Sequence, residues 1–198
     1  MSVLVGLVRH GAHDDLGRIL SGRTSDIPLN AAGRDQVAAL AGRLAGRGIA
    51  QVDTSPRRRT AQTAAIIGGA LGLAPRTAPA LDEIDFGAWS ARAFADLEGD
   101  PAWRHWNAAR GRAPTPGGET MAAAVARAVA HLDGLAAAGA AGPVLCVSHC
   151  DVIRGIAAHA LGLDLDHMLR FDIDPGSVSW LRAHGQGSFH VITLNGPH

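Results

Sequence analysis

The stretch Val3-Leu4-Val5-Gly6-Leu7-Val8-Arg9-His10-Gly11 decides how the rest of the chain can fold. Its apolar run is short, rich in Val and Leu and bounded by glycine, which is typical of a strand buried on both faces of a sheet. The run stops at Arg9-His10, so a guanidinium and an imidazole stand at the end of the strand. In open α/β sheets, ligands bind beyond the carboxyl ends of the strands. The stretch therefore predicts a buried strand that leads into a binding site.

The stretch Pro143-Val144-Leu145-Cys146-Val147-Ser148-His149 repeats this pattern late in the chain. An apolar strand again ends in a histidine, and a helical segment from about 151 to 161 follows. We expect the two histidines to face each other across one site, although they lie far apart in sequence.

Helical spacing and cap residues organise the chain between and beyond these strands. Asn30 and Thr120 are typical N-caps of the helices that follow them, and Ser55-Pro56 has the Ser N-cap and first-position Pro of a third. Alternation at 177–181 and 189–194 predicts a terminal hairpin around Gly185-Gln186-Gly187. Strands that alternate with helices predict an α/β fold, a three-layer α/β/α sandwich with a mainly parallel sheet and helices on both faces.

The length of 198 residues fits one domain, and we expect residues 1–198 to form it, without repeats or an interdomain linker. Residues near 88–116 are expected to form a small lid-like insertion, because Trp103 and Trp106 lie there among arginines and short helical segments.

Composition excludes several classes of function. The 18 basic and 18 acidic residues give zero net charge, which argues against nucleic acid or a membrane surface as partner. The chain has no lysine, which excludes Schiff-base chemistry and a phosphate-loop lysine. Cys146 and Cys150 are expected to be free thiols, and the start of the chain does not resemble a signal peptide. We expect a cytoplasmic protein.

Arg9 and His10 suit phosphate chemistry, because neutral imidazole is a nucleophile and guanidinium binds phosphate oxygens. An ordinary strand end facing water is the alternative reading. Arginines at 57–59 stand in the first turn of a predicted helix, where cations oppose the helix dipole unless they share an anion with the helix N-terminus. A solvated basic cluster is the alternative there, and we expect at least one of the three arginines to be solvated.

Glu83 lies between Leu81 and Ile84, and burial there would raise its pKa toward that of a general acid. A surface salt bridge is the alternative, and Asp82 and Asp85 are further candidates for the acid. A metal site at His10, His13 and Asp14 is disfavoured, since no metal-binding motif is present. The chain also lacks the Gly-x-Ser-x-Gly elbow of serine hydrolases.

Together these segments resemble the histidine phosphatase superfamily, in its phosphoglycerate mutase-like branch. The resemblance spans almost the whole chain in the family's order, through Arg9-His10-Gly11, Gly22-Arg23-Thr24, Arg59-Thr60-Ala61-Gln62-Thr63-Ala64, Leu81-Asp82-Glu83-Ile84-Asp85-Phe86-Gly87, Pro116-Gly117-Gly118-Glu119-Thr120, Val147-Ser148-His149 and Pro175-Gly176-Ser177-Val178.

The resemblance implies roles for individual residues. His10 is the nucleophile that becomes phosphohistidine, and Glu83 protonates the leaving oxygen and then activates water. Arg9, Arg59 and His149 hold the phosphoryl group, with no cofactor and no metal.

The chain departs from the family pattern after Arg9-His10-Gly11, where the usual Asn is missing. Arg18, Ser21 and His13 are candidates for part of its work, and Gly22 joins them as a substrate-binding residue. Cys150-Asp151 replaces the usual Gly-Gly after the second histidine. The roles of His13, Asp14 and Cys150 stay open.

The function predicted is a metal-independent phosphomonoesterase that hydrolyses a small phosphorylated metabolite. The alternatives are phosphoryl transfer of the phosphoglycerate mutase type and a non-catalytic phospho-ligand binder. The segment after Glu83 is shorter than in mutases, which favours hydrolysis. The resemblance makes a homodimer plausible.

Four residues of the insertion are candidates for shaping substrate choice, namely Trp103, Arg104, Trp106 and Arg110.

Overall fold

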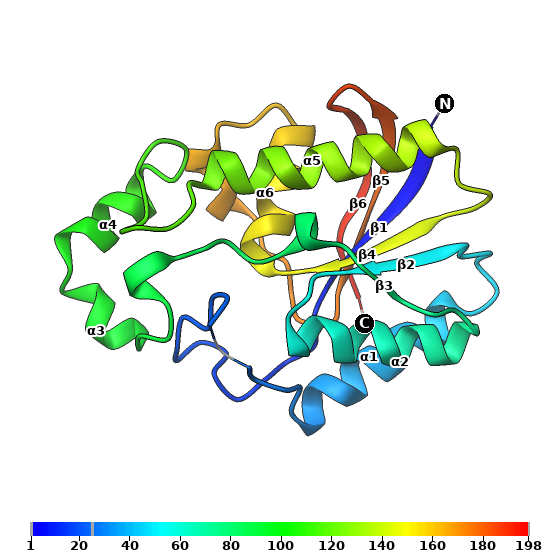
Figure 1. Cartoon of the computed structure of the whole chain (residues 1–198), viewed down its shortest axis with the longest axis horizontal. Coiled ribbons are helices and arrows are strands. Elements are labelled where there is room, and N and C mark those ends of the chain that lie inside the picture. The colour runs from blue at the N-terminus through cyan, green and yellow to red at the C-terminus, as the bar shows by residue number, and fades with distance from the viewer. Residues whose placement is uncertain (1, 25, 198) are drawn as a thin grey trace.

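The computed structural model describes residues 2–24 and 26–197, and a six-stranded sheet forms its centre (Figure 1). The strand order is β3-β2-β4-β1-β5-β6. Strands β3, β2, β4 and β1 are parallel, β5 is antiparallel to β1, and β6 is antiparallel to β5. The strands are β1 Val3–Arg9, β2 Gln51–Thr54, β3 Arg76–Thr77, β4 Val144–Ser148, β5 Val178–Gly185 and β6 Ser188–Gly196.

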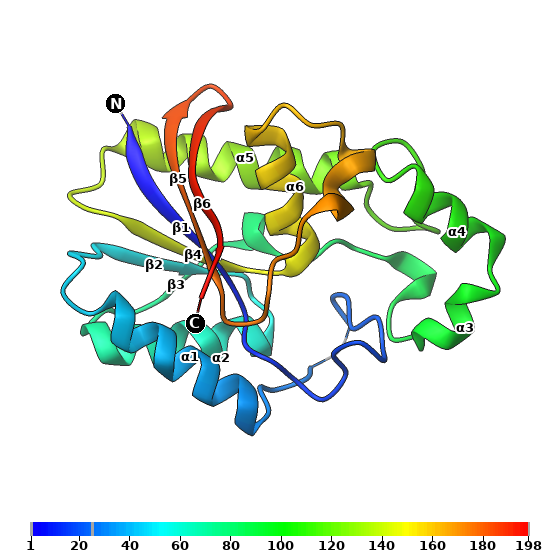
Figure 2. The same ribbon diagram turned by 180° about the vertical axis from the view of Figure 1, so that it is seen from behind.

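Helices cover both faces of this sheet, which confirms the predicted three-layer α/β fold (Figures 1 and 2). Helices α1 (Ala31–Leu44) and α2 (Arg58–Leu71) pack on one face. Helices α5 (Met121–Ala138) and α6 (Cys150–Ala160) pack on the other. Short 3-10 helices at Pro79–Leu81 (η1) and Leu165–Arg170 (η3) complete this part of the chain.

The central strands are apolar throughout because successive side chains point to opposite faces, and both faces are covered. Leu7 and Cys146 belong to the core under α5 and α6. Their neighbours Val8 and Val147 belong to the core under α1 and α2. This alternation explains why β1 and β4 read as continuous apolar runs in the sequence.

Two of the predicted N-caps are confirmed, and one is wrong. Asn30 accepts a hydrogen bond from the backbone of Gly33 at 2.9 Å, and Thr120 accepts one from Ala123 at 3.1 Å. Helix α2, however, begins at Arg58 after an N-cap residue, Arg57, that makes no side-chain cap. The Ser55 hydroxyl is engaged instead in a buried polar chain, described below, because the residue lies at the carboxyl end of β2.

The insertion between the two halves of the fold extends away from the sheet (Figure 1). It contains η2 (Gly87–Trp89), α3 (Phe94–Glu98) and α4 (Pro101–Ala108). Trp106 is fully buried, and its ring stacks on that of Trp103 with centroids 5.3 Å apart. Because these aromatic rings form a core of their own, the insertion has a defined shape beside the end of the sheet.

Helix α5 is long and apolar enough to cross a membrane by length and composition, with a mean hydropathy of 1.2 over 18 residues. In this fold its apolar residues, among them Ala128 and Leu132, pack against the sheet. In all, 44% of this window is buried inside the fold.

Candidate active site

Three parallel strands end at the same edge of the sheet, and each is followed by a polar residue of the site. His10 follows β1, Ser55 follows β2 and His149 follows β4. Backbone hydrogen bonds hold these ends level, since His10 N donates to Ser148 O at 3.1 Å and Ser55 N donates to Val147 O at 3.0 Å. Parallel pairing thus brings together residues that are far apart in the chain.

His10 and His149 do face each other, with ring centroids 5.3 Å apart. Nδ1 of His10 donates to the carbonyl of Gly11 at 2.9 Å, which leaves Nε2 as the unprotonated nitrogen. Burial lowers the pKa of His10 well below its usual value, and the nearby guanidinium groups of Arg59 and Arg9 lower it further. The imidazole is therefore neutral at pH 7, with its Nε2 lone pair available as a nucleophile.

Arg59 is the buried cation at the centre of the site, with 1% of its surface exposed. Its Nε donates to His10 Nε2 at 3.3 Å, and its Nη2 lies 3.0 Å from His149 Nδ1. Nη2 also donates to the carbonyl of Gly22 at 3.0 Å. Gly22 has a φ of 51°, which glycine adopts without strain, and this conformation turns the carbonyl toward the guanidinium. The neighbouring Arg58 is half exposed, as expected for one of the three arginines.

A buried polar chain fixes the orientation of His149. Its Nε2 lies 2.8 Å from the Ser55 hydroxyl, which donates to Asp82 Oδ1 at 3.2 Å. Arg57 binds the same carboxylate through two nitrogens, at 2.9 and 2.8 Å. This pairing leaves Nδ1 of His149 as the nitrogen that faces Arg59 and Glu83.

Glu83 completes the group, with its Oε2 3.6 Å from His149 Nδ1 and 3.9 Å from Arg59 Nη2. Burial raises the pKa of Glu83 to about 7, with Arg59 opposing the shift and Asp151 adding to it. The backbone of Glu83 is held by Arg23 and Arg127, which donate to its carbonyl at 2.6 and 3.0 Å. The carboxyl can therefore exchange a proton near neutral pH from a fixed position.

The structure brings most of the remaining predicted residues to the same cavity, which has a volume of about 560 Å³. Arg9, His13 and Ser21 line it together with Gly22. Arg18 does not line it. Its side chain turns back to the carbonyl of Asp14, because residues 14–18 form a tight turn, so the expectation that Arg18 binds substrate is not supported by its position.

His13 is 6% exposed, and its ring centroid lies 5.2 Å from that of His10. Burial lowers the pKa of His13 to about 4, with Arg59 contributing in the same direction. His13 therefore enters the cavity as a neutral ring, in the region where the resembled family carries its Asn.

The sequence did not predict that Ser55 belongs to the site, or that Arg57 and Asp82, which were candidates for other roles, hold its hydrogen-bond chain. Ser55 carried a signal, its place at the end of a predicted strand, but its position before Pro56 also fits a helix cap. Of the insertion residues named as candidates, Trp103 and Arg110 line the cavity. Trp106 lies in the core behind them, and Arg104 is exposed and donates to the carbonyl of Glu98.

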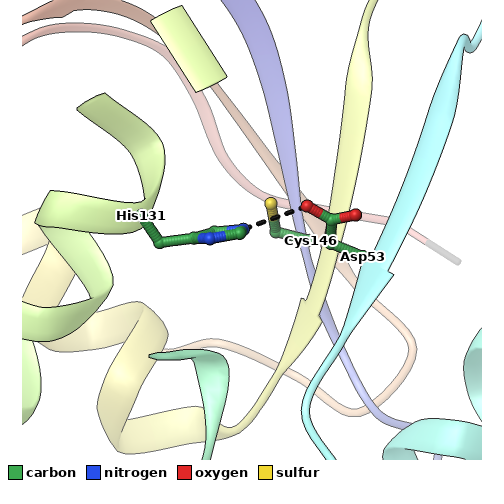
Figure 3. A group of neighbouring side chains, drawn as sticks. All are labelled: Asp53, His131 and Cys146. Atoms are coloured by element: carbon green, nitrogen blue, oxygen red, sulfur yellow. Dashed lines mark hydrogen bonds and ion pairs between the residues drawn. The ribbon is translucent and has the colours of Figure 1, made fainter. Parts of the chain in front are cut away.

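One group of side chains in the described ranges 2–24 and 26–197 has ligand types and spacing suited to a metal ion (Figure 3). It consists of Asp53, His131 and Cys146, whose ligand atoms lie within 4.8 Å of one another. The Asp53 carboxylate already accepts hydrogen bonds from His131, Gln51 and Arg76. These bonds occupy the carboxylate, so we interpret the group as a polar bridge between α5 and the sheet.

Cys146 and Cys150 are both free thiols.

Asp53→Asn is expected to lower the free energy of unfolding by about 1–3 kcal/mol at pH 7, because the partly buried donors His131 and Gln51 lose a buried, charged acceptor. Burial raises the pKa of Asp53, but hydrogen bonds from His131, Gln51 and Arg76 outweigh it and leave the pKa lowered. A lowered carboxyl pKa stabilises the fold above the unfolded value of about 3.9 and loses this effect as pH falls. In urea unfolding the difference from wild type should thus shrink toward pH 3.

The control for this prediction is Asp26→Asn, since Asp26 is an exposed carboxylate paired with Arg58. That variant should stay within about 0.5 kcal/mol of wild type. An equal effect of the two substitutions at pH 7 would contradict a structural role for the bridge.

Comparisons with known proteins agree with this geometry. A model of the histidine phosphatase superfamily (branch 1) matches residues 5–196. The chain is 35% identical over 193 residues to bifunctional protein Rv2228c of Mycobacterium tuberculosis, covering 96% of this chain and 52% of that protein. It therefore spans about half the length of the first curated relatives it matches. It is 36% identical over 163 residues to a probable phosphoglycerate mutase GpmB of Yersinia enterocolitica, covering 80% of this chain and 75% of that protein.

Solved structures give the same result over nearly the whole chain. Bacillus stearothermophilus YhfR superposes with a TM-score of 0.90 at 25% identity, covering 99% of this chain and 98% of that one. The mycobacterial glucosyl-3-phosphoglycerate phosphatase Rv2419c superposes with a TM-score of 0.86 at 25% identity, covering 99% and 100%. With the match extending from β1 to β6, the chain belongs to the histidine phosphatase superfamily, branch 1.

Proposed function

We propose that this protein is a metal-independent phosphomonoesterase that hydrolyses a small phosphorylated metabolite through a phosphohistidine. One observation carries the proposal. The unprotonated Nε2 of His10 stands beside Arg59, and the Glu83 carboxyl, with a pKa of about 7, lines the same cavity. A nucleophile, a cation and an acid are thus within reach of one phosphoryl group.

In the first step, Nε2 of His10 attacks phosphorus, and the P–N bond forms as the ester P–O bond breaks. Glu83 gives its proton to the leaving oxygen, which departs as an alcohol. Within the described residues, Nη1 of Arg59 and Nε of Arg9 are buried and have no hydrogen-bond acceptor. Both residues line the cavity, and these N–H groups are suited to bind the phosphoryl oxygens.

In the second step, the Glu83 carboxylate takes a proton from water as the water oxygen attacks phosphorus. The P–N bond breaks, inorganic phosphate leaves, and His10 returns to its neutral form with the Nε2 lone pair restored. Glu83 ends the cycle protonated, so the two steps balance in protons. His149 is fully buried and positions Arg59, since its Nδ1 accepts from Arg59 Nη2 at 3.0 Å. Its own orientation is maintained by Ser55 and Asp82.

Solved neighbours titled as phosphatases support hydrolysis. The second candidate is phosphoryl transfer of the mutase type, which is favoured by the relative named as a probable phosphoglycerate mutase. The two are separated by adding 3-phosphoglycerate with a catalytic amount of 2,3-bisphosphoglycerate. Efficient formation of 2-phosphoglycerate would favour the mutase, whereas release of inorganic phosphate alone favours the phosphatase.

The proposal is tested by hydrolysis of p-nitrophenyl phosphate in excess chelator, with acid-labile phosphoenzyme trapped from a ³²P-labelled substrate. We expect turnover that resists the chelator, and label on His10 in peptide mapping. Chelator-sensitive turnover would contradict the metal-independent mechanism. Binding of inorganic phosphate without turnover of any phosphomonoester would favour a non-catalytic binder.

Glu83→Gln should lower kcat/KM on alkyl phosphates by about 10²-fold or more, because kcat/KM reports the phosphorylation step and an alkoxide is a poor leaving group without a proton. The acid must be protonated to act, so the wild-type kcat/KM should fall as pH rises through about 7. This basic limb should disappear in the variant. With p-nitrophenyl phosphate, whose leaving group needs no proton, the loss should be smaller. Equal losses on both substrates would contradict the assignment of Glu83 as the acid.

A further inference from the structure

Arg110 is a buried arginine that the reaction described above does not use. It follows α4 in the insertion, lines the cavity and is 6% exposed. Its guanidinium carbon lies 4.1 Å over the ring of Trp106, and its Nη2 donates to Asn107 Oδ1 at 2.8 Å. Stacking and the hydrogen bond together hold the guanidinium in one orientation before any ligand arrives.

The donors of this guanidinium are only partly used. Nη1 forms an ion pair with Asp151 Oδ2 at 2.9 Å. Nevertheless, Nε and Nη1 make no hydrogen bond of normal geometry to any residue in the described part of the chain. A buried donor without an acceptor is costly, so Nε of this fixed arginine, which has no ion-pair partner either, points to a ligand acceptor.

Asp151 places an acceptor beside these donors. It lies in the first turn of α6, two residues after His149, and it lines the same cavity. Arg154 also lines the cavity; it is paired with the exposed Asp172, and its Nη1 lies 3.9 Å from Asp151 Oδ1. The Asp151 carboxylate thus lies between two guanidinium groups and occupies the position that a second anionic group of a substrate would otherwise take.

Apolar side chains line the same cavity. Leu20, Phe94 and Trp103 line it, so a ring or carbon skeleton finds a hydrophobic wall next to the paired donor and acceptor. A hydroxyl group both accepts and donates a hydrogen bond, and it matches a guanidinium beside a carboxylate. An additional carboxylate or phosphate would match the guanidinium but be repelled by Asp151.

We infer that Arg110 and Asp151 form a subsite for hydroxyl groups, so that the substrates are phosphomonoesters of neutral, hydroxyl-bearing molecules such as sugars. Arg110 donates to a hydroxyl oxygen of the organic group, and Asp151 accepts from a hydroxyl. The assignment of a substrate class rests on the proposed function. Binding of a hydroxyl-bearing ligand at the subsite does not require turnover and can be measured separately.

The test compares kcat/KM for four probes, namely glucose 6-phosphate, ribose 5-phosphate, 3-phosphoglycerate and phenyl phosphate. We expect wild type to prefer at least one sugar phosphate over both 3-phosphoglycerate and phenyl phosphate by tenfold or more. Arg110→Met should reduce kcat/KM for that sugar phosphate about 10–100-fold, with a loss at least tenfold smaller for phenyl phosphate. Arg104→Met, an exposed arginine of the same insertion, is the matched control and should change neither value.

Asp151→Asn sharpens the test because it removes the repulsion of a second anion. The ratio of kcat/KM for 3-phosphoglycerate to that for the sugar phosphate should rise by tenfold or more. The ratio is the right readout because Asp151 also raises the pKa of Glu83, and this effect on proton transfer is shared by both substrates.

Wild-type preference for 3-phosphoglycerate, or an equal loss on all probes in Arg110→Met, would overturn the inference. Failure of the proposed function looks different, since no probe would then be hydrolysed. In that case, calorimetric titration of wild type and Arg110→Met with glucose 6-phosphate and with inorganic phosphate tests whether the subsite exists. Weaker binding of the sugar phosphate alone in Arg110→Met supports the subsite, whereas equal binding by wild type and variant rejects it. Melting temperatures establish that each variant is folded.

Discussion

His10→Ala is expected to lower kcat for p-nitrophenyl phosphate by about 10⁴-fold or more, since loss of a nucleophile removes the covalent route altogether. The two ring nitrogens of His10 have different environments, and this difference identifies the nucleophile. Nδ1 is committed to the Gly11 carbonyl, so Nε2 is the nitrogen that can attack, and water bound in its place is a far weaker nucleophile. The same variant should give no trapped phosphoenzyme.

His105→Ala is the matched control, because His105 is an exposed histidine on α4, and its turnover should equal that of wild type. His10→Gln keeps most of the buried volume and guards against a loss that reflects unfolding. Phosphate binding should persist in both His10 variants, since Arg9 and Arg59 remain. If folded His10→Ala retained turnover within tenfold of wild type, the assignment of His10 as nucleophile would be wrong.

The fold was predictable because its signals are local and repeated. Apolar runs that stop at a histidine occur twice, and the rule that parallel strands share a carboxyl edge brings His10 and His149 together without further information. Helix caps at Asn30 and Thr120 were readable for the same reason. The acid, in contrast, could not be chosen from spacing, because Asp82 and Asp85 are equally acidic neighbours of Glu83. Asp82 is buried as well, and its pairing with Arg57 and Ser55 is what sets it apart from Glu83.

The remaining parts of the site depend on geometry that short spacing does not encode. Ser55 meets His149 across 94 positions, and a serine before Pro56 fits a helix cap as well as a hydrogen-bond relay. Arg18 was a candidate for part of the work of the missing Asn, but the turn at 14–18 directs its side chain to the Asp14 carbonyl. The pairing of Arg110 with Asp151 could not be predicted from the sequence, because it arises only when the insertion packs against the start of α6.

Arg59→Met is expected to lower kcat/KM by about 10³-fold, since a single preorganised donor to a developing charge is worth about 10²–10³ and this guanidinium supplies more than one. Its Nε and Nη2 contact both site histidines, and its Nη1 is free to bind a phosphoryl oxygen. Arg59→Lys should recover little of the loss, because a single ammonium cannot reproduce the planar fork.

Arg58 offers a control within the same helix turn. It carries the same charge one residue away, but it is half exposed and pairs with Asp26 outside the cavity. If long-range positive potential at the start of α2 were sufficient for phosphate binding, Arg58→Met and Arg59→Met would weaken turnover to a similar extent. The geometry predicts that Arg58→Met stays within about threefold of wild type, because screening by water leaves an exposed charge little effect on a buried site. Similar losses would contradict the contact mechanism, and a loss confined to Arg59 would support direct binding of the phosphoryl group by its guanidinium.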